Sequence, residues 1–172
     1  MTEDDPTNKM AKVFVWLAWI VAITLLMFFF QDTLDKQFNP NSQPEMRLTD
    51  TGKAEVVLAQ NRQGHYVAHG TINDMPVTFL LDTGATQVSI PAHIADKLNL
   101  TGQGNYRVQT ANGSVTVYKT KLDQLSIGSI LLYNVAAHIN PGMKADEILL
   151  GMSALKRLDF HQTGKQLILR EP

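Results

Sequence analysis

A carboxylate at the end of an apolar run is the feature of this sequence that most directly suggests chemistry. Residues 79–85 read FLLDTGA, so Asp82 follows three apolar residues and is followed by Thr83 and Gly84. A buried strand normally excludes an unpaired carboxylate, because taking its charge out of water is unfavourable. Two interpretations are open: Asp82 is a positioned catalytic group, or these residues form an ordinary turn that ends a strand.

A second apolar run resembles the first but lacks the acid. Residues 147–158 read EILLGMSALKRL, and the segment ILLGMSA has the same strand-to-turn character as FLLDTGA. This similarity indicates a degenerate internal repeat. We therefore expect the second run to flank the strand that carries Asp82 and to pack against its loop.

A hairpin is predicted between these two runs, in residues 107–118, which read RVQTANGSVTVY. Asn112-Gly113 is typical of a two-residue type I′ turn. The expected cross-strand pairs are Thr110 with Val115 and Val108 with Val117, opposite a face that carries Arg107, Gln109, Thr116 and Tyr118. The hairpin is either an ordinary surface hairpin or a flap over a cleft that lends backbone hydrogen bonds to an extended ligand.

The elements that would position these residues form a mostly β domain. After about residue 53, short runs rich in Val, Ile, Thr and Leu alternate with turn signals. The expected strands are Ala54–Ala59, His65–Ile72, Val77–Asp82, Gln87–Ile90, Tyr106–Ala111, Ser114–Ile127, Ile130–Ile139 and Gln166–Arg170. Two short helices are expected, one from Pro91 to Leu98 and one capped by Ser153 that continues to Leu158.

The N-terminal region predicts a membrane anchor. Residues 13–30 carry no charge and have Thr24 as their single polar residue, and as a helix they would span about 27 Å, close to the thickness of a bilayer's hydrocarbon layer. A buried core helix would show a polar stripe, and a cleaved signal peptide would usually have a shorter apolar region before a small-x-small site. Because Lys9 and Lys12 precede the span, we expect the N-terminus in the cytoplasm and the remainder outside.

These patterns divide the chain into four parts. Residues 1–12 form the cytoplasmic segment and residues 13–30 the transmembrane helix. Residues 31–52 contain Pro40, Pro44 and Gly52 with little periodicity, and they are expected to be a flexible tether. Residues 53–172 form the β domain.

Composition excludes several classes of site and partner. The 172 residues have a net charge of −1 and no basic block, so we expect no nucleic-acid partner. Cysteine is absent, which excludes disulfides and cysteine-ligated metal sites. His65 and His69 are four residues apart, but their surroundings indicate a strand and no HExxH motif occurs. We therefore expect no metal and no other cofactor.

Taken together, the motifs resemble those of the retropepsin-like aspartic proteases. The resemblance covers about residues 54–170 and rests on LLDTGA, the hairpin, and the later ILLG before a short helix. More narrowly, the chain is similar to membrane-anchored bacterial members, in which one N-terminal span precedes a single-lobe protease domain. The resemblance implies a retropepsin-like single-lobe acid protease fold, closed and barrel-like with short helices, preceded by one transmembrane helix.

The resemblance also implies roles for individual residues. Asp82 would be the catalytic aspartate, in a loop completed by Thr83, Gly84 and Ala85. The flap would hold Asn112 and Gly113, and the second glycine loop Leu150 and Gly151. Because one chain supplies one such acid, the missing partner should be Asp82 of a second copy, related by a two-fold axis. Two carboxylates this close share a proton and can activate a water.

The expected function is that of a membrane-tethered aspartic endopeptidase, a homodimer that cleaves peptides bound in extended conformation. Two alternatives stay open: a dimeric peptide-binding or scaffold module with the same fold, and a membrane-anchored β domain with an unrelated role. Asn99-Leu-Thr and Asn112-Gly-Ser match the glycosylation sequon. A glycan at the flap tip would obstruct the cleft, so a bacterial inner membrane with a periplasmic protease domain fits better than a eukaryotic secretory route.

Overall fold

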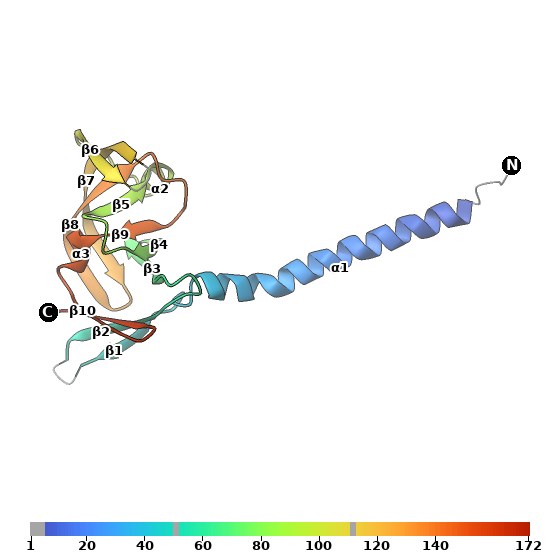
Figure 1. Cartoon of the computed structure of the whole chain (residues 1–172), viewed down its shortest axis with the longest axis horizontal. Coiled ribbons are helices and arrows are strands. Elements are labelled where there is room, and N and C mark those ends of the chain that lie inside the picture. Colours follow the sequence, from blue (N-terminus) through green and yellow to red (C-terminus); the bar gives the residue numbers. More distant parts are fainter. Residues whose placement is uncertain (1–5, 50–51, 111–112) are drawn as a thin grey trace. The chain divides into compact units, whose positions relative to one another are not determined.

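The computed structural model describes residues 6–49, 52–110 and 113–172 of the chain. It divides into two compact units, Met1–Gln37 and Phe38–Pro172, which are described separately (Figure 1). Helix α1 (Pro6–Phe38) makes up the described part of the first unit. Its segment Met10–Phe38 is long and apolar enough to cross a membrane, and its apolar side chains are exposed. A signal sequence would share these properties.

The second unit is mostly β, as the sequence predicts (Figure 1). Its strands are β1 (Glu45–Leu48), β2 (Ala54–Ala59), β3 (Val67–Ile72), β4 (Met75–Leu81), β5 (Val88–Pro91), β6 (Asn105–Thr110), β7 (Gly113–Ile127), β8 (Ile130–Asn140), β9 (Ile148–Leu150), β10 (Asp159–Thr163) and β11 (Gln166–Arg170). Two short helices, α2 (Ala92–Lys97) and α3 (Met152–Leu155), follow β5 and β9. The eight strands expected from the sequence are all present, and their ends differ from the expected ones by at most two residues.

The strands form two sheets. The smaller sheet has the order β1-β2-β11-β10 and is antiparallel throughout. The larger has the order β3-β4-β9-β5-β8-β7-β6. Residues 70–72 of β3 also pair with residues 125–127 of β7, which closes the larger sheet on itself. Within it, β4 runs parallel to β9 and β5 runs parallel to β8, so segments far apart in the sequence meet at the same level of the sheet.

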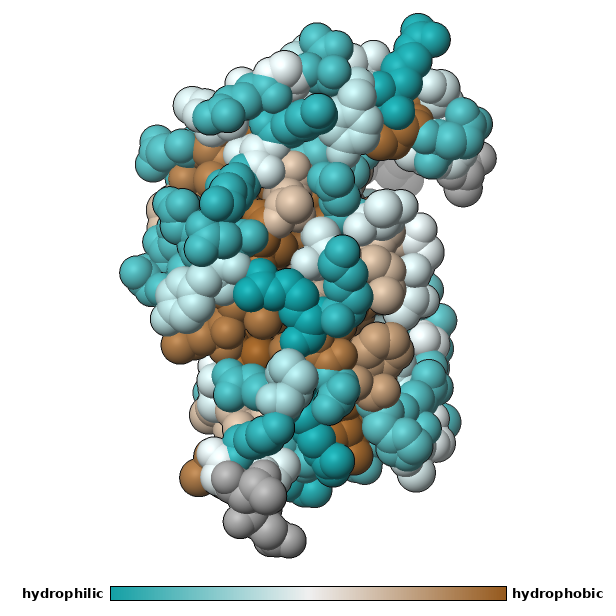
Figure 2. Space-filling model, turned by 90° about the vertical axis from the view of Figure 1, so that its left-hand side faces the viewer, coloured by the Kyte–Doolittle hydropathy of each residue, from teal (hydrophilic) through white to brown (hydrophobic). Residues whose placement is uncertain are grey.

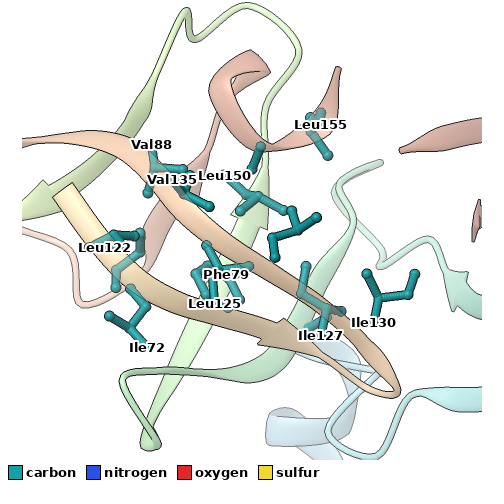
Figure 3. Close-up of a cluster of buried hydrophobic side chains, with 14 of the residues drawn as sticks. Ile72, Phe79, Val88, Leu122, Leu125, Ile127, Ile130, Val135, Leu150 and Leu155 are labelled. Atoms are coloured by element: carbon teal, nitrogen blue, oxygen red, sulfur yellow. The ribbon is translucent and has the colours of Figure 1, made fainter. Parts of the chain in front are cut away.

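The closed sheet surrounds the hydrophobic core. Figure 3 shows side chains from strands of this sheet and from α3 gathered in one cluster around Phe79, which has no exposed surface. Alternation along the strands supplies these residues, because successive side chains of a strand point to opposite faces. The outer surface differs: on the face in Figure 2, hydrophilic residues separate the apolar ones into small patches.

Strands β1 and β10 were not expected from the sequence. Every residue of both strands is exposed, so neither shows the alternation of buried and exposed residues by which strands are recognised. β9 is only three residues long and lies within the second apolar run. The expected cap of the last helix is wrong: Gly151 is the N-cap of α3, and Ser153 instead accepts a hydrogen bond from Val88 N and donates one to Ala136 O.

The segment 31–52 differs most from its expected character as a flexible tether. Helix α1 continues through residues 31–38, and β1 pairs with β2. Between them the buried Asn41 donates from Nδ2 to Ala59 O (2.9 Å) and Val67 O (2.7 Å), while its Oδ1 accepts from Ala59 N (2.6 Å). One side chain therefore joins the segment after α1 to β2 and β3.

We predict that Asn41→Ala lowers the free energy of unfolding of the Phe38–Pro172 unit by about 2–3 kcal/mol, because it leaves three backbone polar groups without their partner. Urea unfolding followed by far-UV circular dichroism measures this change. Ser42→Ala, at the exposed neighbouring position, is the control and should stay within about 0.5 kcal/mol of the wild type. Equal stability of the two variants would mean that Asn41 does not hold the segment in place.

Candidate active site

Asp82 lies immediately after β4, at the point where that strand leaves the sheet. Its backbone N–H donates to Leu150 O (3.1 Å) at the end of β9, and its backbone O accepts from Ala85 N (3.2 Å). Its carboxylate Oδ1 accepts from Gly84 N (2.8 Å), which orients the acid within its own turn. The side chain is half-buried, so it is reachable from solvent and is still positioned by the backbone around it.

The loop after β9 holds the Asp82 loop in place through backbone contacts. β4 and β9 pair in parallel with Leu81 opposite Leu150, as the similarity of the two apolar runs predicts. Beyond this pair, Met152 N donates to Ala85 O (2.8 Å) and Ser153 N donates to Thr86 O (3.0 Å). The two loops are therefore joined backbone to backbone.

Gly151 is required for this close approach. A Cβ at this position would lie 2.3 Å from Gln87 O and 2.6 Å from Ala85 O, far inside any normal contact distance. Both atoms belong to the backbone, so neither can move aside as a flexible side chain could. The glycine, rather than an acid, is what the second loop must have at this point.

The β6–β7 hairpin forms as expected, but its register is different from the predicted one. The observed pairs are Thr110 with Gly113 and Val108 with Val115, a slip of two residues from the expected pairing. A slip of two keeps every side chain on its own face, so the hydrophobic pattern cannot distinguish the two registers. Asn112, half of the predicted turn, lies outside the described residues. Gly113 has φ = +106°, a backbone angle that disfavours β-branched side chains.

A cavity of about 790 Å³ opens in front of Asp82. Its lining comes from the acid and its loop, from β5, β6 and β8, and from β9: Asp82, Gly84, Ala85, Thr86, Gln87, Ser89, Tyr106, Val108, Gln109, Thr110, His138, Asn140 and Leu149. Of the residues singled out in the sequence, Asp82, Gly84 and Ala85 line this cavity. The lining does not include Thr83, Gly113, Leu150 or Gly151. Leu150 and Gly151 instead contact the backbone of the Asp82 loop.

Sequence reasoning missed the polar wall of the cavity. Tyr106 Oη lies 3.2 Å from Gln87 Oε1 and 3.0 Å from His138 Nδ1, and His138 Nε2 lies 2.8 Å from Ser89 Oγ. Ser89 and His138 are buried. One signal could have revealed them: His138 and Asn140 interrupt the apolar segment NVAAHIN, where a strand beside the core would normally carry hydrophobic residues.

Burial changes the acid–base properties of this wall. Desolvation lowers the pKa of His138, which favours the neutral imidazole. Desolvation also raises the pKa of Tyr106, so that its hydroxyl stays protonated. Within residues 6–49, 52–110 and 113–172, no group of three or more His, Asp or Glu side chains lies close enough together to hold a metal ion. The chemistry available to one chain is thus a single oriented carboxylate beside neutral hydrogen-bonding groups.

Comparison with known proteins gives three kinds of match. Residues 68–157 match the family model described as gag-polyprotein putative aspartyl protease. An uncharacterised protein in the 5′ region of cobV of Sinorhizobium sp is 34% identical over 119 residues, which are 67% of this chain and 51% of that protein. An uncharacterised protein of Rickettsia prowazekii (strain Madrid E) is 30% identical over 122 residues, 69% of this chain and 52% of that protein. The chain thus spans about half the length of the curated relatives it matches.

Among solved structures, one match is a retropepsin-like aspartic protease from Rickettsia conorii. The two share 26% sequence identity with a TM-score of 0.57, over 75% of this chain and 95% of that one. The retropepsin-like fold expected from the sequence motifs is therefore confirmed.

We predict that the stability of this domain falls as the pH drops through about 6.5, partly because of His138. Its pKa is lowered in the folded state, so the unfolded chain takes up a proton first and is favoured on acidification. The contribution is fully present above the unfolded pKa. Urea unfolding at about pH 7.5 and about pH 5.5 should show a smaller fall for His138→Gln than for the wild type. The exposed His161→Gln should behave like the wild type, and an equal fall in all three would exclude His138 as a source.

Proposed function

Since this chain belongs to the retropepsin-like family of aspartic proteases, we propose that it is an aspartic endopeptidase whose catalytic aspartate is Asp82. The observation that carries the proposal is the geometry of the Asp82 loop. Its carboxylate is oriented by Gly84 N and lines the cavity, while the matching loop at Gly151 has no room for a side chain. Thr83, Gly84 and Ala85 complete the active-site loop, and Leu150 with Gly151 forms the loop that supports it.

A single carboxylate is an incomplete aspartic protease site, so the second one must come from another chain. We assign it to Asp82 of a second copy, related by a two-fold axis. The two carboxyl groups, about 3 Å apart, cannot both ionise and share one proton. The pair then titrates as a unit, and activity should be lost on the alkaline side when the second carboxyl ionises.

The reaction proceeds through a water held between the two carboxyl groups. The ionised carboxylate takes a proton from the water, whose oxygen attacks the carbonyl carbon of the peptide. The protonated carboxyl donates its proton to the carbonyl oxygen, which gives a neutral tetrahedral gem-diol. The carboxyl that took the proton of the water then passes it to the amide nitrogen, while the other carboxylate takes a hydroxyl proton from the gem-diol. The C–N bond breaks, the two products leave, and the pair again holds one proton. No covalent bond to the enzyme forms at any step.

The β6–β7 hairpin is the candidate flap. Val108, Gln109 and Thr110 line the cavity, so the end of β6 borders the same space as Asp82. An extended peptide in the cavity could add its backbone to the edge strand β6 by hydrogen bonding, with side-chain pockets left to supply any preference for sequence. Asn112 and Gly113 would then form the tip that covers the substrate.

Residues 13–30 within α1 would anchor the enzyme in a bilayer, which we take to be a bacterial inner membrane with the protease domain in the periplasm. The length and apolar character of α1 support an anchor, and Lys9 and Lys12 before the span support this orientation. Neighbouring anchors in one membrane raise the effective concentration of the partner chain.

A non-proteolytic peptide-binding or scaffold module with the same fold is the second candidate. A binding module would have no need of an oriented carboxylate in its cavity, so Asp82 and its bond to Gly84 N favour the protease. No observation specifically favours a third role.

Asp82→Asn should abolish cleavage of peptides, and subunit mixing tests whether two chains share the site. If wild-type and Asp82→Asn chains exchange freely in equal amounts, about half of the dimers are mixed and about a quarter are wild type. Mixed dimers lack one of the acid and base groups, so activity per wild-type chain should fall to about half. Exchange is verified by energy transfer between labelled chains. Activity that is unchanged by proven exchange would mean that one chain works alone.

Gly113→Val should reduce kcat/KM by more than tenfold while leaving the fold intact, because a β-branched residue resists φ = +106° and would rebuild the hairpin end. Peptide cleavage and thermal unfolding measure the two effects. Gly164→Val is the control, since it also places a β-branched residue at a positive φ (+59°), in the β10–β11 turn outside the cavity. Equal effects of both variants on turnover would show that the hairpin is not a working flap.

A reporter fused after Pro172 tests the orientation. Alkaline phosphatase, which folds in the periplasm, should be active in the fusion, and a reporter that requires the cytoplasm should be inactive. The reverse pattern would place the protease domain in the cytoplasm.

A further inference from the structure

The lining of the cavity includes a connected group of polar side chains, the polar wall, which comes from three different parts of the sheet. Gln87 and Ser89 come from the segment that enters β5 and from β5 itself, Tyr106 comes from β6, and His138 and Asn140 come from β8. Apolar lining comes from Ala85, Val108 and Leu149. A peptide lying in this cavity would therefore meet both polar and apolar neighbours.

We propose that this polar wall is a specificity subsite, which accepts a substrate side chain ending in a hydrogen-bond-accepting oxygen, a carboxamide or a carboxylate, close to the cleaved bond. The inference rests on the proposed function in so far as it calls the bound peptide a substrate. The recognition itself requires only that a peptide occupies the cavity.

The hydrogen bonds inside the wall determine which atoms are free for a ligand. The Tyr106 hydroxyl donates to Gln87 Oε1, so it accepts from His138 Nδ1–H. His138 Nε2 then accepts the hydroxyl proton of Ser89, whose other neighbour, Met143 Sδ at 3.2 Å, is a weaker acceptor. Ser89 Oγ in turn lies 3.5 Å from Asn140 Nδ2. The hydroxyls of Tyr106 and Ser89 and both ring nitrogens of His138 thus have partners within the protein.

The groups of the polar wall that remain for a ligand are the hydrogen-bond donors of two side-chain amides. Because Gln87 turns Oε1 to Tyr106, its Nε2 amide has no partner among the residues that the structure describes. Asn140 uses Oδ1 to accept from Gly142 N (2.9 Å), and its Nδ2 makes one long bond to Ser89, so a second amide proton is uncommitted. Two amide donors with no acceptor beside them fit an acceptor oxygen on the ligand.

An apolar ligand side chain fits this wall poorly. Contact with Leu or Met would remove the Gln87 amide from water without giving it a new partner, which is unfavourable. A site built to hydrogen-bond its ligand rejects an analogue of the same shape that lacks the polar atom far more strongly than an apolar pocket rejects an extra methylene. Asp82 is the one carboxylate among the described residues of the lining, so acidic side chains would meet no further like charge on this wall.

A structural role for the network is the alternative, since it joins the base of the hairpin to β5 and β8. Loss of a structural bond would lower the stability of the protein or its overall rate of cleavage. It would not change the ratio of the cleavage rates of two substrates that differ in one atom type. The ratio is therefore the quantity to measure.

The experiment uses the full-length chain in detergent micelles and a peptide library of random sequence, with cleavage sites read by mass spectrometry. At one position near the cleaved bond, the wild type should prefer Asn, Gln, Asp and Glu over Leu and Met by about tenfold. Gln87→Met, which keeps the side-chain shape and removes the amide, should reduce this preference several-fold. Gln124→Met makes the same chemical change on β7 outside the cavity and should leave the preference unchanged.

Gln87→Glu distinguishes the two kinds of accepted side chain. This variant keeps an oxygen for Tyr106 but replaces the amide donor by a second oxygen. Acidic residues should lose their enrichment through charge repulsion, while Asn and Gln can donate to the new carboxylate and should keep theirs. Equal loss for both classes would also support the assigned donor, whereas no loss for either would contradict it.

Two outcomes overturn the inference and leave the proposed protease function standing, provided that cleavage disappears in Asp82→Asn. One is a preference for apolar residues at every position of the substrate. The other is a preference in Gln87→Met that equals that of the wild type. If the wild type cleaves nothing, the proposed function fails and binding decides the inference. The same library is then passed over immobilised Asp82→Asn chain, and retained peptides are identified. Enrichment of oxygen-bearing side chains that Gln87→Met abolishes supports the subsite, and its absence overturns it.

Discussion

The Asp82 loop and the Gly151 loop hold each other by backbone hydrogen bonds, and the rest of the site depends on this contact. Asp82 N bonds Leu150 O, and Met152 N bonds Ala85 O, so each loop fixes the other at both of its ends. Backbone bonds impose little on side-chain identity, except where the chains approach too closely for any side chain at all, as at Gly151. The position of the carboxylate is therefore set by the main chain of two parallel strands, which are held in turn by the core around Phe79.

This arrangement explains how much of the molecule could be inferred from the amino-acid sequence. The strands that border the core were recognisable because they are short runs rich in Val, Ile, Thr and Leu, separated by turn signals. The paired loops were recognisable because each combines an apolar run with a turn. In contrast, β1 and β10 bury none of their residues, and their pairing depends on backbone groups that are the same in every sequence.

Other features escaped prediction because they depend on contacts between distant residues. The hairpin register was misjudged by two positions, since both registers put the same side chains on the same faces. Asn41 looked like part of a polar linker, and only its three bonds to β2 and β3 reveal an integral part of the domain. Gln87 precedes β5, Tyr106 lies on β6 and His138 on β8, and no spacing in the sequence indicates that the three meet at one wall.

The bonds of Asn41 also determine how far the folded unit can be shortened at its N-terminus. Asn61 Nδ2 donates to Phe38 O (3.0 Å), and Asn41 bonds Ala59 and Val67, so residues 38–41 are an integral part of this unit. A fragment that begins at residue 45 would keep β1 but would leave these polar groups of β2 and β3 without their partners. The shortest fragment that keeps all of these bonds therefore begins at Phe38.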